Sequence, residues 1–357
     1  MTSVVPDDRD AEIQGIALPY PPGWVDRFTA WVERRPWPSW SSYLTIGIGL
    51  LIIQALVVWA EGALPFGNIN IAQAYLAGAI AFMLAMIQFL DSRAGVALET
   101  MRPVLKGDDR EFSRLFYELT TLPSRTTLLA GLAALIFVFL TEAIGEPYKL
   151  ETLQTFPVSV NFLRFIYLAC WWMFGAFLYH TVHQLRAINV IYTKYTRVDL
   201  LRVKALYAFS KIAALTAGSV AMLGYGWLLA NPWIDRSDPL VFIPMVVLVL
   251  SAIATFIWPQ LGVHSLQVAE KGRLIAEANL RLESLISDLH QQVDDRELAG
   301  MTDLNMAMAS LEIELNTLRK TPTWPWEPEV LQVLITALAL PLGLWLIQLI
   351  LERIVNP

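Results

Sequence analysis

Seven long apolar stretches dominate the sequence and constrain what the chain can fold into. Each is close to the roughly 20 residues that a helix needs to cross about 30 Å of hydrocarbon. They cover residues 43–60, 70–90, 126–141, 160–179, 206–230, 239–258 and 330–351. Because the backbone must satisfy its own hydrogen bonds inside lipid, we expect these stretches to be helices. The sequence therefore predicts an all-α membrane protein with seven transmembrane helices.

Composition agrees with a membrane protein and argues against other classes. Hydrophobic residues make up 55% of the chain and charged residues 16%, whereas a soluble domain carries about 25% charge. The net charge of −6 argues against a nucleic-acid partner, since phosphate binding needs a basic surface. The single cysteine, Cys170, excludes an internal disulfide framework. No catalytic or nucleotide-binding motif occurs, so we expect neither an enzyme nor a bound cofactor.

The distribution of lysine and arginine predicts the orientation. Of the 26 such residues, most fall in four segments that alternate with the spans: 1–42, 91–125, 180–205 and 259–329. The segments on the other side hold only Lys149, Arg236 and Arg353. The positive-inside rule then places the N-terminus in the cytoplasm and the C-terminus outside, in a multi-pass protein of the plasma (inner) membrane.

Four regions follow from this topology. They are a cytoplasmic N-terminal arm with an interfacial helix (1–42), a six-helix transmembrane bundle (43–258), a cytoplasmic hairpin (259–329) and a seventh transmembrane helix, the candidate pore helix (330–357). Trp24, Phe28 and Trp31 form the apolar face expected of the interfacial helix. We expect two short helices in the cytoplasmic loop 91–125 and an extension of the neighbouring spans in the cytoplasmic loop 180–205.

The hairpin carries a coiled-coil pattern. Its leucine and methionine positions, spaced 4, 3, 4 and 3, are Leu304, Met308, Leu311, Leu315 and Leu318. Such a seam needs a partner surface. The partner is either the other arm of the same hairpin or a cytoplasmic bundle of several subunits, in which case these residues anchor an oligomer.

Aromatic residues concentrate around the fourth span. A ligand pocket for a small apolar or amphiphilic molecule is one interpretation, lined by Phe137, Phe139, Tyr167, Trp171 and Trp172 and oriented by Arg164. Ordinary helix packing and lipid contact, with Arg164 reaching the membrane surface, is the other.

The histidines allow one further arrangement. A metal site made by His180, His183 and His264 is geometrically feasible, and solvated or capping histidines are the alternative that we favour. We therefore assign no metal site.

The whole architecture resembles the insect odorant and gustatory receptor superfamily, including relatives outside animals. The shared features are an inside N-terminus, fourth to sixth helices that extend inward, and a long hairpin before a last helix that ends outside. In the seventh helix, Gln348-Leu349 match the family's Gln-hydrophobic ending, whereas Pro341-Leu342 stand where the family has Thr-Tyr.

The resemblance implies a homo-oligomeric, tetrameric, ligand-gated cation channel. The seventh helix would line the pore, with Trp345, Gln348 and Leu349 at its gate. The hairpin would hold the subunits together, and the ligand would bind in the outer half of the membrane. The implied partners are lipid, other copies of the chain and a small apolar ligand.

The outer segments carry charge of the sign that a cation channel needs. Their acidic residues are Glu61, Glu142, Glu146, Glu151, Asp235, Asp238 and Glu352, against three bases, a net of −4. Such a field concentrates cations at a pore mouth. The alternatives are a membrane sensor or scaffold that does not conduct and whose coiled coil recruits a cytoplasmic partner, and a transporter or membrane-enzyme subunit.

Overall fold

The computed structural model describes residues 18–144, 155–197, 206–231, 239–295 and 300–336, with residues 338, 339 and 343. This part of the chain is all-helical, and no β-strand occurs within it. Its helices are α2 (Trp24–Glu33), α3 (Ser39–Ala60), α4 (Ile71–Met101), η1 (Arg102–Val104), α5 (Asp109–Thr120), α6 (Ser124–Ile144), α8 (Pro157–Val190), η2 (Ile191–Tyr195), α10 (Ser210–Ala230), α11 (Pro239–Asp294) and α12 (Met301–Lys320). A last helical segment covers 328–336.

Within the described part of the chain, five helices are long and apolar enough to cross a membrane. They are Ser39–Ala60, Ile71–Val104, Pro157–Tyr195, Ser210–Ala230 and Val249–Asp294. The third predicted span lies in α6, of which Ser124–Leu140 forms a shorter apolar helix. The seventh predicted span, 330–351, lies largely outside the described residues. The chain is therefore a helical protein with several membrane-length apolar helices.

Glycines allow α6 and α8 to approach each other closely. A Cβ atom on Gly175 would lie 2.4 Å from the carbonyl oxygen of Ala130. A Cβ atom on Gly131 would lie 2.8 Å from the ring of Trp172. Larger residues at either position would push the two helices apart, as is typical where small residues allow membrane helices to approach.

Hydrogen bonds to backbone groups fix both ends of the bundle. At one end, the Glu61 carboxylate accepts the backbone N–H groups of Val158 and Ser159, at 2.9 and 2.6 Å, and so joins the end of α3 to the start of α8. At the other end, the Arg197 N–H donates to the carbonyl of Val104 at 2.7 Å and joins the ends of α4 and α8. The two ends of α8 are thus held by different neighbours.

Two regions between the spans agree with the prediction only in part. Loop 91–125 contains two short helices, η1 and α5, but α4 also continues through its first part to Met101, which the prediction did not include. The reason is a buried stripe on α4, in which Leu90, Ala94 and Leu98 are fully buried and carry the helix past Asp91. Helix α8 continues to Val190 and then widens into the π-helix η2, as the predicted extension requires, whereas α10 begins only at Ser210.

Helix α2 is part of the core rather than a surface helix alone. Val25 and Val32 are fully buried in a cluster with residues of α4 and α8. Of the predicted apolar face, Trp24 and Phe28 pack against this cluster, while Trp31 is 49% exposed beneath the guanidinium of Arg35. The valines, which the aromatic pattern did not indicate, hold α2 to the bundle.

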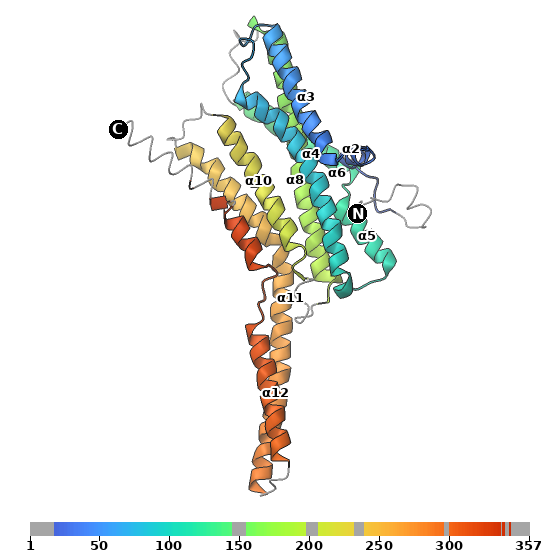
Figure 1. Ribbon diagram of the computed structural model, residues 1–357, viewed down its shortest axis with the longest axis vertical. Coiled ribbons are helices and arrows are strands. Elements are labelled where there is room, and N and C mark those ends of the chain that lie inside the picture. Colours follow the sequence, from blue (N-terminus) through green and yellow to red (C-terminus); the bar gives the residue numbers. More distant parts are fainter. Residues whose placement is uncertain are drawn as a thin grey trace, which may run out of the picture.

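Helix α11 is 56 residues long, about 84 Å at 1.5 Å per residue. Figure 1 shows it leaving the bundle, with α12 packed along its far part. We call residues 268–294 of α11 together with α12 the stalk. After α12, residues 321–327 return to the bundle, and we call them the linker.

Candidate functional site

A buried histidine–aspartate contact joins α4 and α8. His180 Nε2 lies 2.8 Å from Asp91 Oδ1, and the two side chains are 2% and 15% exposed. One helical turn further along α8, Gln184 Nε2 donates to the same oxygen at 3.0 Å. The spacing of four residues puts His180 and Gln184 on one face of α8, so a single carboxylate accepts from both.

Helix α2 adds a second carboxylate to this region. Asp26 Oδ2 accepts the N–H of Gly23 at 2.8 Å, which caps the first turn of α2. The same oxygen accepts the N–H of Leu122, just before α6, at 3.1 Å. Gly23 in turn donates to the Leu122 carbonyl at 2.8 Å. We call Asp26, Asp91, His180 and Gln184 the polar layer.

The electrostatics of Asp26 are unusual for an aspartate. Burial, followed by repulsion from the Asp91 carboxylate, raises the pKa of Asp26 to about 7. The two backbone N–H donors and the nearby His180 act in the opposite direction but do not cancel these effects. A carboxyl group with this pKa exchanges its proton at neutral pH, where an ordinary aspartate stays ionised.

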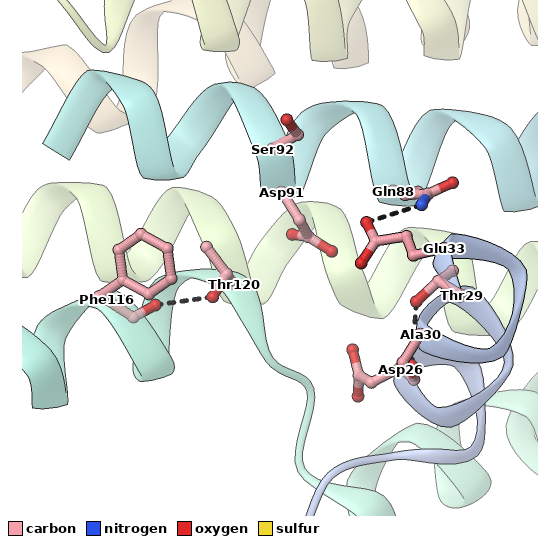
Figure 2. Close-up of a pocket in the computed structure, with 9 residues that line it drawn as sticks. All are labelled: Asp26, Thr29, Ala30, Glu33, Gln88, Asp91, Ser92, Phe116 and Thr120. Atoms are coloured by element: carbon pink, nitrogen blue, oxygen red, sulfur yellow. Dashed lines mark hydrogen bonds between the residues drawn. The ribbon is translucent and has the colours of Figure 1, made fainter. Parts of the chain in front are cut away.

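A hollow of about 30 Å³ lies beside Asp26 and Asp91, with room for about two water molecules. Figure 2 shows side chains from α2, α4 and α5 around it: Asp26, Thr29, Ala30, Glu33, Gln88, Asp91, Ser92, Phe116 and Thr120. Gln88 connects three helices here. Its Nε2 donates to Glu33 Oε1 on α2, and its Oε1 accepts from the Tyr43 hydroxyl on α3, both at 2.7 Å.

The second histidine of α8 faces a different group. His183 Nε2 lies 2.9 Å from the carbonyl oxygen of Glu118 and 3.2 Å from the Tyr20 hydroxyl. Tyr20 also donates to the carbonyl of Thr121 at 3.0 Å. Burial, followed by the nearby Glu118 carboxylate, raises the pKa of Tyr20 above its ordinary range, so its hydroxyl keeps its proton. These bonds hold the segment before α2 against α5 and α8.

The three-histidine arrangement does not form. His180 and His183 bond to different partners, and His264 lies on α11, where its Nδ1 is 2.9 Å from the carbonyl oxygen of Thr323. Within the described part of the chain, no group of three or more His, Cys, Asp or Glu side chains could hold a metal ion.

The predicted ligand pocket is only partly assembled. The ring of Trp171 lies 5.8 Å from that of Phe137 and 6.3 Å from that of Tyr167. Arg164 lies on the same face of α8 as Tyr167 and Trp171, because Tyr167 is three residues after Arg164 and Trp171 is four residues after Tyr167. Trp172, by contrast, packs over Gly131 of α6.

Phe139 is not part of this aromatic contact. It lies two residues beyond Phe137, about 200° around α6, and is 47% exposed. Spacing within the α6 sequence was sufficient to predict this separation, because residues i and i+2 of a helix do not share a face.

The other predicted sites have different outcomes. The pore residues Trp345, Gln348 and Leu349 lie outside the described residues. On α12, Leu315 and Leu318 are buried, and the other seam residues, Leu304, Met308 and Leu311, are half-buried. Since α12 packs along α11, the seam is at least partly covered within one chain.

Sequence reasoning missed Asp26 and Asp91, the centre of the polar layer. One signal was present: Asp91 directly follows an apolar run, and the helical pattern continues beyond it through Ala94 and Leu98. An acid inside a continuing amphipathic helix needs a buried partner.

Comparison of the chain with family models, with curated proteins and with solved structures gives no match.

Proposed function

We propose that the protein is a homo-oligomeric, tetrameric, ligand-gated cation channel of the plasma (inner) membrane, with the last helix of each subunit lining the pore. In this proposal the polar layer and the stalk face the cytoplasm. The five membrane-length helices of the described residues, the very long α11 among them, support the architecture on which the proposal is based. The outer-segment charge of −4 per chain, repeated in an oligomer, favours cations at the mouth.

The observation that carries the proposal is the attachment of the linker, residues 321–327. The His264 ring stacks on Trp324, with ring centres 3.8 Å apart and an interplanar angle of 7°. Trp324 stacks on Trp326 at 4.4 Å, and Trp326 contacts Phe256 of α11 at 5.4 Å. The chain between the stalk and the last helix is therefore packed against α11 by a continuous row of rings.

Two lysines fix the ends of the linker. Lys271 Nζ donates to the carbonyl oxygens of Arg319 and Thr321, both at 2.8 Å, where α12 ends. Lys211, at the start of α10, pairs with Glu327 at 3.1 Å, just before the last helix begins. A displacement of α11 at this level would therefore carry the linker and the start of the last helix with it, which is the coupling that a gate on this helix requires.

The start of the last helix is packed on one face only. Val330 and Leu334 are buried in the cluster formed with α10 and α11. Val333 and Ile335, on either side of this packed face, are 67% and 55% exposed in the single chain. These exposed apolar side chains support contact with lipid or with neighbouring subunits. The half-buried seam positions of α12, such as Leu311, leave room for subunit contacts in the stalk.

A ligand site between α6 and α8 is part of the proposal. The contacts of Trp171 with Phe137 and Tyr167 support it. Tryptophan fluorescence titration with apolar ligands tests it. We expect Trp171→Ala to weaken binding about tenfold, and Phe139→Ala, outside the aromatic contact, to leave binding unchanged. Equal affinity in both variants and the wild type would assign the rings to helix packing.

Planar-bilayer recording of the purified protein tests conduction. A narrow apolar gate excludes ions by dewetting, so Leu349→Ala should raise the resting current. Gln348→Lys should lower the preference for cations, because it adds a ring of positive charge. Absence of conductance in the wild type and both variants, across ligands and voltages, would reject the channel.

A further inference from the structure

The outward face of α12 carries an apolar stripe that the seam does not use. Met306 and Ile313 are 57% and 68% exposed, and Ala309 is exposed between them. Spacings of three and four residues place the three side chains on one side of the helix. The buried seam residues, Leu315 among them, lie on the opposite side, toward α11. Helix α12 thus has two apolar faces, and its own chain covers one.

Acidic residues flank the exposed stripe on both sides. Asp303 and Glu314 lie along one edge and Glu312 along the other, all three exposed. They belong to a strongly acidic segment. Residues 277–316 contain nine acidic residues and two basic ones, a net charge of −7, which exceeds the −6 of the entire chain.

The charge decides which occupant fits this face. In helix pairs, the positions that flank the apolar contact face each other, so opposite charges there select the partner and like charges exclude it. Two copies of α12 packed through this stripe would bring the same carboxylates together. Anionic lipid would be repelled for the same reason. A helix with lysine or arginine beside its apolar residues would instead pair with Asp303, Glu312 and Glu314.

We propose that the outward face of α12, formed by Met306, Ala309 and Ile313 and flanked by Asp303, Glu312 and Glu314, is a docking surface for a basic amphipathic helix of another protein. The surface is on the side of α12 away from the seam. The proposal does not depend on conduction: a protein that fails to conduct can still bind such a helix, and the binding assay below does not measure current.

The test uses the full-length protein in nanodiscs of zwitterionic phosphatidylcholine, because a neutral lipid does not attract a basic peptide electrostatically. The probe is a fluorescein-labelled peptide of four heptads, with leucine and isoleucine in the apolar positions and lysine in the flanking positions. A matched peptide has glutamate in place of lysine. Fluorescence anisotropy is measured at low and high salt, with empty nanodiscs as the blank.

Three variants separate the features of the surface. Ile313→Ser removes the apolar contact, and Glu312→Gln with Glu314→Gln removes charge. Leu280→Ser is the matched control, since Leu280 is 67% exposed on α11, outside the proposed surface. We expect the lysine peptide to bind the wild type, more weakly at high salt. We expect the first two variants each to weaken binding about tenfold, and the control to bind like the wild type.

Several results would overturn the proposal. The glutamate peptide could bind as well as the lysine peptide, or Leu280→Ser could weaken binding as much as Ile313→Ser. No binding of the lysine peptide to the wild type would have the same meaning. Spontaneous disulfide-linked dimers of an Ile313→Cys variant would assign the surface to a second copy of the chain. The native Cys170 is buried, so such a bond would form through position 313.

Discussion

Asp91 on α4 and Glu312 on α12 are both carboxylates in the middle of long helices, but their surroundings are opposite. Asp91 is 15% exposed and accepts hydrogen bonds from His180 and Gln184. Glu312 is exposed beside an apolar stripe. In the polar layer, buried polar contacts join α4 to α8, and burial sets the pH at which Asp26 binds a proton. On the stalk, charge contributes little to folding and is available for recognition.

The largest expected effect on stability comes from removing the Asp91 carboxylate from the polar layer. Asp91→Ala leaves His180 and Gln184 buried without their shared acceptor, which should cost about 2–6 kcal/mol of unfolding free energy, because each buried group left unsatisfied costs about 1–3 kcal/mol. Glu283→Ala, on the exposed surface of the stalk, should change it by less than about 0.5 kcal/mol. Unfolding of the detergent-solubilised protein measures both. Similar losses of unfolding free energy in the two variants would mean that carboxylates of the polar layer and of the stalk contribute equally to folding.

The second effect is a pH dependence that the polar layer should show. The pKa of Asp26 is raised from 3.8 to about 7, so the folded protein holds a proton that the unfolded chain loses. The contribution of Asp26 to the free energy of unfolding is fully present below pH 4 and is lost as the pH rises through 7. The total loss is about 2–4 kcal/mol.

Asp26→Asn should remove this dependence, because an amide oxygen can still accept the N–H groups of Gly23 and Leu122 without ionising. We expect the variant to be more stable than the wild type at pH 8, with a difference that shrinks as the pH falls and disappears below pH 4. Asp303→Asn on the stalk is the control and should leave the pH profile unchanged. A wild-type profile that rises from pH 5 to 8 would contradict the assignment.

The third effect concerns the apolar part of the stalk. Leu315 is 4% exposed and Ile313 is 68% exposed, although they are two residues apart. Leu315→Ala should lower the free energy of opening the hairpin by about 2–3 kcal/mol, whereas Ile313→Ala should not change it. Hydrogen exchange of the α12 amides reports this opening directly. Equal protection in the two variants would mean that the seam contributes nothing within one chain.

The smallest effect concerns Lys271, a charged residue of the stalk that, unlike Glu312, has fixed hydrogen-bond partners. Lys271→Met removes the donor to the carbonyls of Arg319 and Thr321, and the linker amides should lose about 1 kcal/mol of protection. Lys320→Met, on the exposed surface, should leave the linker unchanged. If the linker amides of both variants exchange hydrogen at the same rate, Lys271 does not stabilise the linker, and it resembles the other charged residues of the stalk.

The sequence was sufficient to predict the helices but not the polar layer. Long apolar runs define α3, α4, α8, α10 and α11, because each run has the length that a membrane requires. The 4, 3, 4, 3 spacing on α12 predicted which side of the helix is apolar, and Leu315 and Leu318 are buried there. Spacing along one helix carries no information on which partner covers that side.

The polar layer depends on contacts between distant parts of the chain. Asp26, Asp91 and His180 come from three helices, and no local pattern connects them. The position at which α4 ends is likewise not predictable from the local sequence. Asp91 marks the end of an apolar run, but burial of Leu98 and Met101 against other helices decides that the helix continues. Tertiary packing, rather than local preference, sets both features.

The stalk has a mechanical consequence. Its α11 arm extends about 40 Å from residue 268 to the end of α11, and its base joins the last helix through the stacked rings of the linker. A rigid arm of this length is a lever, in which a tilt of about 0.1 radian moves the tip by about 4 Å and the base by a small fraction of that. A modest force at the tip therefore becomes a larger force over a shorter distance at the linker. A molecule that binds the far end of the stalk and pulls on it would exert its greatest torque where the last helix begins.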